Sequence, residues 1–244
     1  EGEFTKEFFA FLKDGSPVTL PWDEPAVQAE NEQDPKIKIP LLLKARDNAE
    51  ALFTTNSLEY TQLLESLGYE YYLSDDYQTA ATTFEKTVAH YKKHLPQNDI
   101  RTADALYFLS SCESKLGKSE DEKRTLLQLI ELIDTHHNGS YENLISVLSS
   151  LGSAYETEPE KAYPYLSRGF DLVLKTTNTV EDYQAAILLI YNMHSYCMDV
   201  KDWKKALEIN NQSMALAEKW EGKKSDNYIE LVSLRGIIER SLGK

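Results

Sequence analysis

A repeat of 42 residues constrains this chain more than any other feature of its sequence. Stepping by that interval meets aliphatic residues only, at Leu64, Leu106, Leu148, Ile190 and Val232. The register four positions later holds Gly68, Ser110, Gly152, His194 and Gly236. A fixed period of this length is typical of repeat architectures, in which each unit buries its apolar face against the next. The sequence therefore predicts a stack of similar units.

Each unit is predicted to contain two helices joined by a short turn. Residues of the types that cap helix starts stand eight positions before the aliphatic series, at Asn56, Asn98, Ser140 and Asp182. The turn before the second helix reads Asp76, Tyr77 and Ala80, and three periods later Asp202, Trp203 and Ala206. In the third unit, Ala162 and Leu166 match Ala80 and Phe84 only if two residues are deleted at this turn. The predicted units are 56–97, 98–139, 140–181, 182–223 and a truncated or capping unit at 224–244.

Gly68 lies inside a predicted amphipathic helix, where glycine costs roughly 1 kcal/mol relative to alanine. Antiparallel helices approach closely only where small side chains face each other. We therefore interpret Gly68 and Ala80 as packing residues that bring two helices together, with Tyr71 and Phe84 filling the space beside them.

These residues resemble the tetratricopeptide repeat (TPR) family. The motif is carried by Leu64, Leu67, Gly68, Tyr71, Ala80 and Phe84, and it returns as Leu148, Leu151, Gly152, Tyr155, Ala162 and Leu166. The period is similar to that of the longer-helix variant found in kinesin light chains and bacterial peptide-sensing regulators. The resemblance covers residues 56–244 and implies an all-α, right-handed α-solenoid of antiparallel helix hairpins with about four and a half repeats. The sequence departs from the pattern at Glu113, Glu122, His194, Cys197 and Asn210, so irregular packing is expected there.

Residues 1–55 lack the clean pattern and are expected to form an N-terminal helical cap. Phe4, Phe8 and Phe11 line one face of a short predicted helix, and the segment 15–25 is proline-rich. A further helix is predicted over Pro40–Phe53, with proline at its start. Two interpretations stay open: residues 20–53 form a degenerate extra hairpin, or the proline-rich segment lies along the solenoid as an internal ligand.

The family resemblance implies that binding uses the concave face, which the first helices of the hairpins form. The registers that point to this face hold Tyr69, Tyr72, Tyr107, Ser111, Ser149, Ser153, Tyr191, Asn192 and Ser195. Tyrosine and serine suit an adaptable peptide-binding surface, because they combine apolar area with hydrogen bonding at low entropic cost. The groove is expected to be neutral. Chaperone-binding members of the family hold a terminal carboxylate with lysine and asparagine here, and the absence of lysine disfavours such a clamp.

Composition and local patterns exclude several other classes of function. The formal charge of −14 argues against nucleic acid as a partner. The longest apolar run, 185–190, is too short for membrane insertion. Cys112 and Cys197 are interpreted as buried small hydrophobes, and His90 and His94 lack a third ligand. No metal or cofactor is expected.

The sequence thus predicts a non-catalytic interaction module, a scaffold, adaptor or sensor domain that binds a peptide or partner helix in its groove. It contains no glycine-rich phosphate loop, nucleophile elbow or paired Cys and His of catalytic type. The alternative is the regulatory portion of a larger enzyme, a protease or signalling kinase, whose catalytic domain lies beyond residue 244. The residues do not identify the oligomeric state or the compartment. The cytoplasm is the default expectation, and export is the alternative if an N-terminal leader has been removed.

Overall fold

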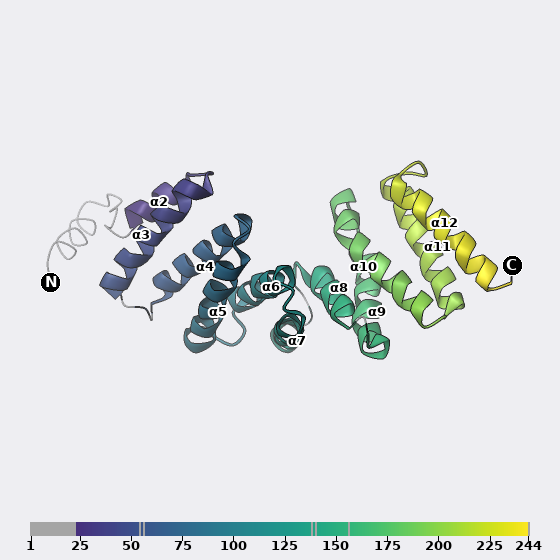
Figure 1. Cartoon of the computed structure of the whole chain (residues 1–244), viewed down its shortest axis with the longest axis horizontal. Coiled ribbons are helices and arrows are strands. Elements are labelled where there is room, and N and C mark those ends of the chain that lie inside the picture. The colour runs from purple at the N-terminus through teal and green to yellow at the C-terminus, as the bar shows by residue number, and fades with distance from the viewer. Residues whose placement is uncertain are drawn as a thin grey trace. The chain divides into compact units, whose positions relative to one another are not determined.

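The structure is a computed structural model, which describes residues 23–53, 55, 57–137, 139, 141–155 and 157–243. Within these residues all regular structure is helical, so the all-α prediction is confirmed. The helices are α2 (Asp23–Glu30), α3 (Pro35–Phe53), α4 (Leu58–Leu73), α5 (Tyr77–His94), α6 (Ile100–Lys115), α7 (Ser119–His136), α8 (Leu144–Ala154), α9 (Pro159–Thr176), α10 (Val180–Asp199), α11 (Trp203–Trp220) and α12 (Asp226–Ser241) (Figure 1).

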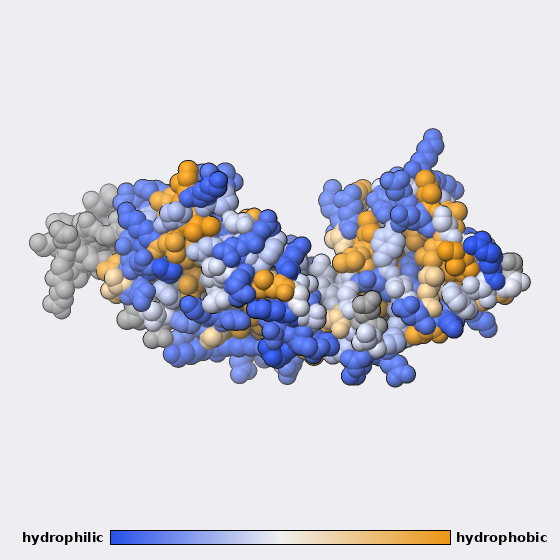
Figure 2. Space-filling view, in the orientation of Figure 1, coloured by the Kyte–Doolittle hydropathy of each residue, from blue (hydrophilic) through white to orange (hydrophobic). Residues whose placement is uncertain are grey.

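The chain divides into two compact units inside α7, between Thr125 and Leu126. In the first unit, each helix from α2 to α5 packs against the next one along the chain. In the second unit, α8 pairs with α9 and α10 with α11, while α10 also packs against both α8 and α9, and α12 packs on α11. Each unit is therefore a stack of helix hairpins, as the repeat predicted. Hydrophilic residues cover most of the visible surface of each unit, and smaller hydrophobic patches lie among these residues (Figure 2).

The aliphatic series forms the core, with one exception. Leu64, Leu106, Leu148 and Ile190 are each less than 5% exposed. Val232 in α12 is 46% exposed, because no helix follows α12 in the described part of the chain to cover it. Burial of the repeated position thus depends on the presence of the next helix.

Gly68 has the packing role that the sequence predicted. It is buried, and a Cβ atom built on it would lie 3.0 Å from the Phe84 ring, while Ala80 beside that ring is fully buried. The close approach of α4 and α5 therefore leaves little room for a side chain at position 68.

The turn within a hairpin repeats with the same geometry. Asp75, Gly117 and Lys201 are each spaced by whole periods, and each has a positive φ, at 62°, 69° and 57°. The amide after each of them bonds a carbonyl five residues earlier, for example Asp202 N to Cys197 O at 2.9 Å. This is the Schellman arrangement, which ends the first helix and reverses the chain.

The predicted helix starts are wrong in detail. The side chain of Ser57 caps α4, that of Asp99 rather than Asn98 caps α6, and that of Thr179 caps α10, with Asp182 as its capping-box partner. The remaining predicted caps, Asn56 and Ser140, lie outside the described residues. Several residues of capping type stand near each start, and the cap is the one whose backbone is extended there; ψ is 124° at Asp99 and 169° at Thr179.

The helix predicted over Pro40–Phe53 begins earlier, at Pro35, so that Pro40 lies inside it. Asp34 provides the start, because its Oδ1 accepts from Lys36 N at 3.0 Å and its carbonyl from Lys38 N at 2.9 Å. Burial of Leu42, Ala45 and Ala49 then holds the helix together past the proline. The short helix predicted around residues 4–12 and most of the proline-rich segment lie outside the described residues.

Candidate functional site

The predicted groove tyrosines of the first unit gather around Phe108 on α6. The ring centroids of Tyr69, Tyr72 and Tyr107 lie 5.3, 5.9 and 5.5 Å from that of Phe108, all edge to face. Phe84 of α5 stacks on the same ring at 5.5 Å. Tyr69 is 41% exposed, and burial raises the pKa of Tyr72. We call these five residues the Phe108 cluster; they form a partly exposed aromatic surface that joins α4 to α6.

Ser111, the other predicted groove residue of this unit, uses its hydroxyl on its own helix. Its Oγ donates to the carbonyl of Tyr107 at 3.0 Å. Ser111 therefore lies beside the aromatic surface as a small, partly exposed residue.

The polar groove residues of the second unit are bonded to one another. Asn192 of α10 donates through Nδ2 to Ser149 O at 3.2 Å, Ser149 Oγ at 3.0 Å and Ser153 Oγ at 2.8 Å. Ser149 is only 2% exposed, so it positions Asn192 and is not itself available to a ligand. These bonds tie α8 to α10.

Tyr191 joins α10 to α12 in a similar way. Its hydroxyl donates to the Glu230 carboxylate and lies 3.4 Å from Asn227 Oδ1. Burial, together with the bond to Glu230, raises the pKa of Tyr191 to about 12. The phenol is therefore protonated at neutral pH and donates the hydrogen bond that links it to Glu230.

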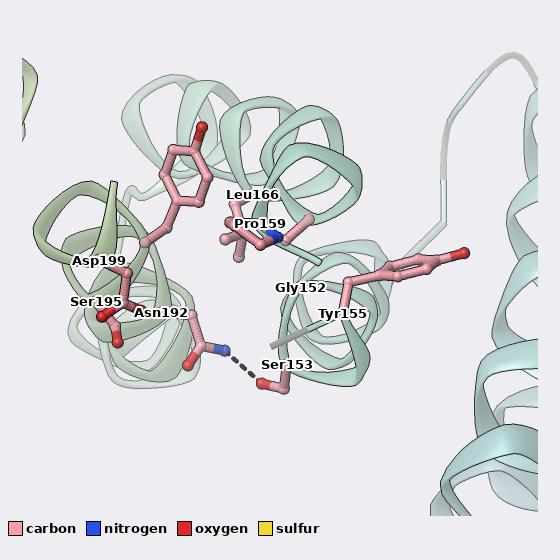
Figure 3. A pocket seen from close by; sticks show the side chains of 10 residues that line it. Gly152, Ser153, Tyr155, Pro159, Leu166, Asn192, Ser195 and Asp199 are labelled. Atoms are coloured by element: carbon pink, nitrogen blue, oxygen red, sulfur yellow. Dashed lines mark hydrogen bonds between the residues drawn. The ribbon is translucent and has the colours of Figure 1, made fainter. Parts of the chain in front are cut away.

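A cavity of about 230 Å³ opens between α8, α9 and α10 (Figure 3). It brings together the predicted groove residues Ser153, Asn192 and Ser195. It also contains residues that the groove prediction did not include, namely Gly152, Tyr155, Pro159, Ala162, Leu166, Tyr196 and Asp199. Asn192 extends from α10 toward Ser153 of α8, Pro159 and Leu166 of α9 lie beside this bond, and the Tyr155 ring points away (Figure 3). The expectation of a neutral groove is wrong here, because Asp199 makes the cavity acidic.

Asp199 could have been found from its spacing. It follows Ser195 by four residues, which places both on one face of α10. The contributions of Pro159 and Leu166 have no such signal, because their register shifts at the shortened turn of this hairpin.

The histidine and cysteine residues that the sequence singled out contact other parts of the fold or are buried in it. Thr61 Oγ1 lies 3.3 Å from His90 Nδ1, and His194 is buried, with Nδ1 2.8 Å from Ile190 O. Cys112 and Cys197 are buried free thiols, as predicted. Among the described residues, no three His, Cys, Asp or Glu side chains are grouped so as to hold a metal ion. None of the described helices combines the length and the apolar character needed to cross a membrane.

Comparison with known proteins identifies the fold. No protein-family model and no curated protein sequence matches this chain. Among solved structures, the TPR-like repeats of a Podosopora anserina protein assigned as a kinesin light chain match with a TM-score of 0.62 at 14% identity, over 81% of this chain and 93% of that one. BtubC (BKLC) from P. vanneervenii matches at 0.63 and 10% identity, over 87% and 85% of the two chains.

A third solved structure, the apo form of RapI, matches over the whole of this chain and 86% of its own, with a TM-score of 0.54 and 14% identity. Like the other two, it shares the fold with this chain at low sequence identity. The chain therefore has the fold of the TPR-like helical repeat proteins.

Proposed function

We propose that this chain is a non-catalytic interaction module that binds an extended peptide or a partner helix along the first helices of its hairpins. The observation that carries the proposal is the way groove-register residues of successive first helices meet. Tyr69 and Tyr72 of α4 contact Phe108 of α6, and Ser149 of α8 accepts a hydrogen bond from Asn192 of α10. A ligand that follows these helices therefore crosses a continuous surface within each unit.

The chemistry of the first unit suits apolar contact with a peptide. The Phe108 cluster is held by four ring contacts, so its exposed tyrosine edges lose little conformational freedom when a ligand binds. Tyrosine is enriched among the residues that dominate binding energy at protein interfaces. This surface supplies affinity for apolar side chains of a ligand.

The chemistry of the second unit suits polar and cationic groups. Asp199 lines the cavity between α8, α9 and α10, Glu230 accepts a hydrogen bond from Tyr191, and the net charge of the chain is −14. A field of this sign attracts basic ligands and repels nucleic acid phosphates. The preferred partner is therefore a peptide or helix with basic residues.

The test is selection of phage-displayed random peptides on the full chain, followed by fluorescence polarisation with a peptide that binds. Tyr69→Ala and Tyr107→Ala each remove an aromatic side chain from the Phe108 cluster and are expected to weaken binding about tenfold or more. Leu174→Ala is the matched control, because Leu174 is a 39% exposed residue of a second helix, α9. Equal affinities for all variants, with helical content preserved, would contradict the proposed binding face.

A further inference from the structure

The cavity of the second unit has an internal counterpart in the first, two periods earlier. Phe108 stands 84 residues before Asn192, and Tyr69 stands 84 residues before Ser153. In the first unit these positions hold two rings in edge contact at 5.3 Å, and Phe108 also stacks on Phe84. In the second unit the same positions hold an amide and a hydroxyl, joined by one hydrogen bond of 2.8 Å. The cavity exists because small polar side chains replace the rings.

The close packing between the two helices of the hairpin is found in both units, while the side chains at the position of the cavity differ. Gly152 corresponds to Gly68, and Leu166 of the shortened hairpin corresponds to Phe84. A Cβ on Gly152 would lie 2.2 Å from Leu166 Cδ2, so the contact between the two helices of the hairpin is as close as in the first unit. The opening is therefore a local property of the groove registers and not a consequence of looser helix packing.

The polar groups of the cavity accept hydrogen bonds and carry negative charge. Both amide hydrogens of Asn192 are committed to Ser149 and Ser153, which leaves Oδ1 as an acceptor. Within the described part of the chain, the Asp199 side chain forms no hydrogen bond or ion pair with another side chain. No lysine, arginine or histidine lines the cavity. The position that corresponds to Asp199 in the first unit, 84 residues earlier, holds Lys115. The sign of the charge at this position is therefore reversed between the units.

The size of the cavity limits what it holds. At about 230 Å³ it is smaller than the 300–1,000 Å³ typical of sites for drug-sized molecules. It suits one long side chain, whose methylene stem would lie against Leu166, Ala162 and Pro159 while its charged end meets Asp199. Lysine and arginine are the side chains that combine such a stem with several donors and a positive charge.

We propose that this cavity is a specificity subsite that takes one lysine or arginine side chain of a peptide ligand, with Asp199 as its counter-charge and Asn192 Oδ1 as a hydrogen-bond acceptor. The proposal rests on the proposed function, because it assigns the chemistry of one position in the bound peptide. It also predicts that the equivalent place in the first unit, which rings occupy, does not select a cation.

The experiment uses the full chain and peptides selected from the phage-displayed random library. We expect the selected peptides to share a lysine or arginine at one position, and replacement of that residue by norleucine to weaken binding. Asp199→Asn should weaken the parent peptide about fivefold, which is near the upper range for a solvent-accessible ion pair. Asp199→Lys, which copies the charge of Lys115, should weaken it more than tenfold. Asp171→Asn is the matched control, since Asp171 is an exposed acid of α9 that does not line the cavity.

Two further measurements distinguish binding at this subsite from a general effect of charge, and from peptide binding elsewhere on the chain. A peptide whose basic residue is changed to glutamate should recover binding to Asp199→Lys. Asn192→Phe, which copies Phe108, should abolish the preference for a basic residue while the chain keeps its helical content. Tight peptides without a common basic position, or equal effects of Asp199→Asn and Asp171→Asn, would overturn the subsite and leave groove binding intact. Failure to select any peptide that binds the full chain would overturn both proposals.

Discussion

Replacing glycine by alanine at two equivalent positions of the repeat is expected to change stability in opposite directions. Gly68 in α4 and Gly236 in α12 are separated by four whole periods. Both lie inside a helix, where alanine is favoured over glycine by about 0.8–1 kcal/mol. The sign of the total effect then depends on what the added methyl group meets.

At Gly68 the methyl group meets an aromatic ring that has little room to move. A Cβ there would lie 3.0 Å from Cε2 and Cζ of Phe84 and 3.1 Å from Cε1. Phe84 is fully buried and also stacks on Phe108. Overpacking of this kind costs about 1–3 kcal/mol, which exceeds the helix-propensity gain. We expect Gly68→Ala to lower the free energy of unfolding by about 1 kcal/mol.

At Gly236 the methyl group meets almost nothing. The nearest atom to a Cβ there is Nη1 of Arg240 at 3.7 Å, which is an ordinary contact to a flexible side chain. Gly236→Ala should therefore keep the helix-propensity gain and raise the free energy of unfolding by about 0.5–1 kcal/mol. The two variants should differ by about 1.5–2 kcal/mol.

Urea denaturation followed by far-UV circular dichroism measures both free energies, and hydrogen exchange of peptides from α4 and α12 locates the changes. Each variant serves as the control for the other, because the substitution and the register are the same. Equal stability of Gly68→Ala and the unmodified chain would refute the argument that Phe84 requires glycine at position 68. Destabilisation by Gly236→Ala would refute the argument that its helix face is open.

Two buried carboxylates give further predictions. Lys38 Nζ lies 2.7 Å from Oε1 of Glu70, whose side chain is 5% exposed, so Lys38→Met should lower the free energy of unfolding in urea by about 2–3 kcal/mol; no change would contradict the assignment of Lys38 as the counter-charge. Burial raises the pKa of Glu113 above its ordinary 4.5, so the native state binds a proton on this carboxyl more tightly than the unfolded state does. The free energy of unfolding should therefore fall as pH rises from 4.5 through the native pKa of Glu113. Glu113→Gln should make this fall shallower in melting temperatures between pH 4.5 and 7, and an unaltered slope would exclude Glu113 as its source.

The core could be predicted from the sequence because burial in a stacked repeat has the same period as the repeat itself. Leu64 and Leu148 occupy the same register of the repeat and are both buried, so one alignment predicts both. The prediction fails at Val232, where the alignment continues but no described helix follows. Helix starts are less predictable, because the cap depends on the local backbone angle as well as on residue type, as Asp182 shows.

The site could be predicted only in part. The predicted groove registers include Asn192 and Ser153, because register follows from helical periodicity. They do not show that Ser149 is buried beneath Asn192, or that a cavity opens beside it. A cavity depends on the volume that several side chains from three helices leave unfilled, and no single position carries that information.

The two units keep the same hairpin geometry with different links between their first helices. In the first unit, Tyr69 and Phe108 join α4 to α6 through ring contacts, which are worth about 0.5–1.5 kcal/mol per pair beyond the area they bury. In the second unit, Asn192 joins α8 to α10 through hydrogen bonds to Ser149 and Ser153, each worth about 0.5–1.5 kcal/mol.

The amide occupies less volume than the ring, so the second unit keeps its helices together and still leaves room beside them. Substitution at a groove register can therefore change the ligand chemistry of one repeat while the glycine contact inside the hairpin, at Gly68 or Gly152, continues to set the backbone.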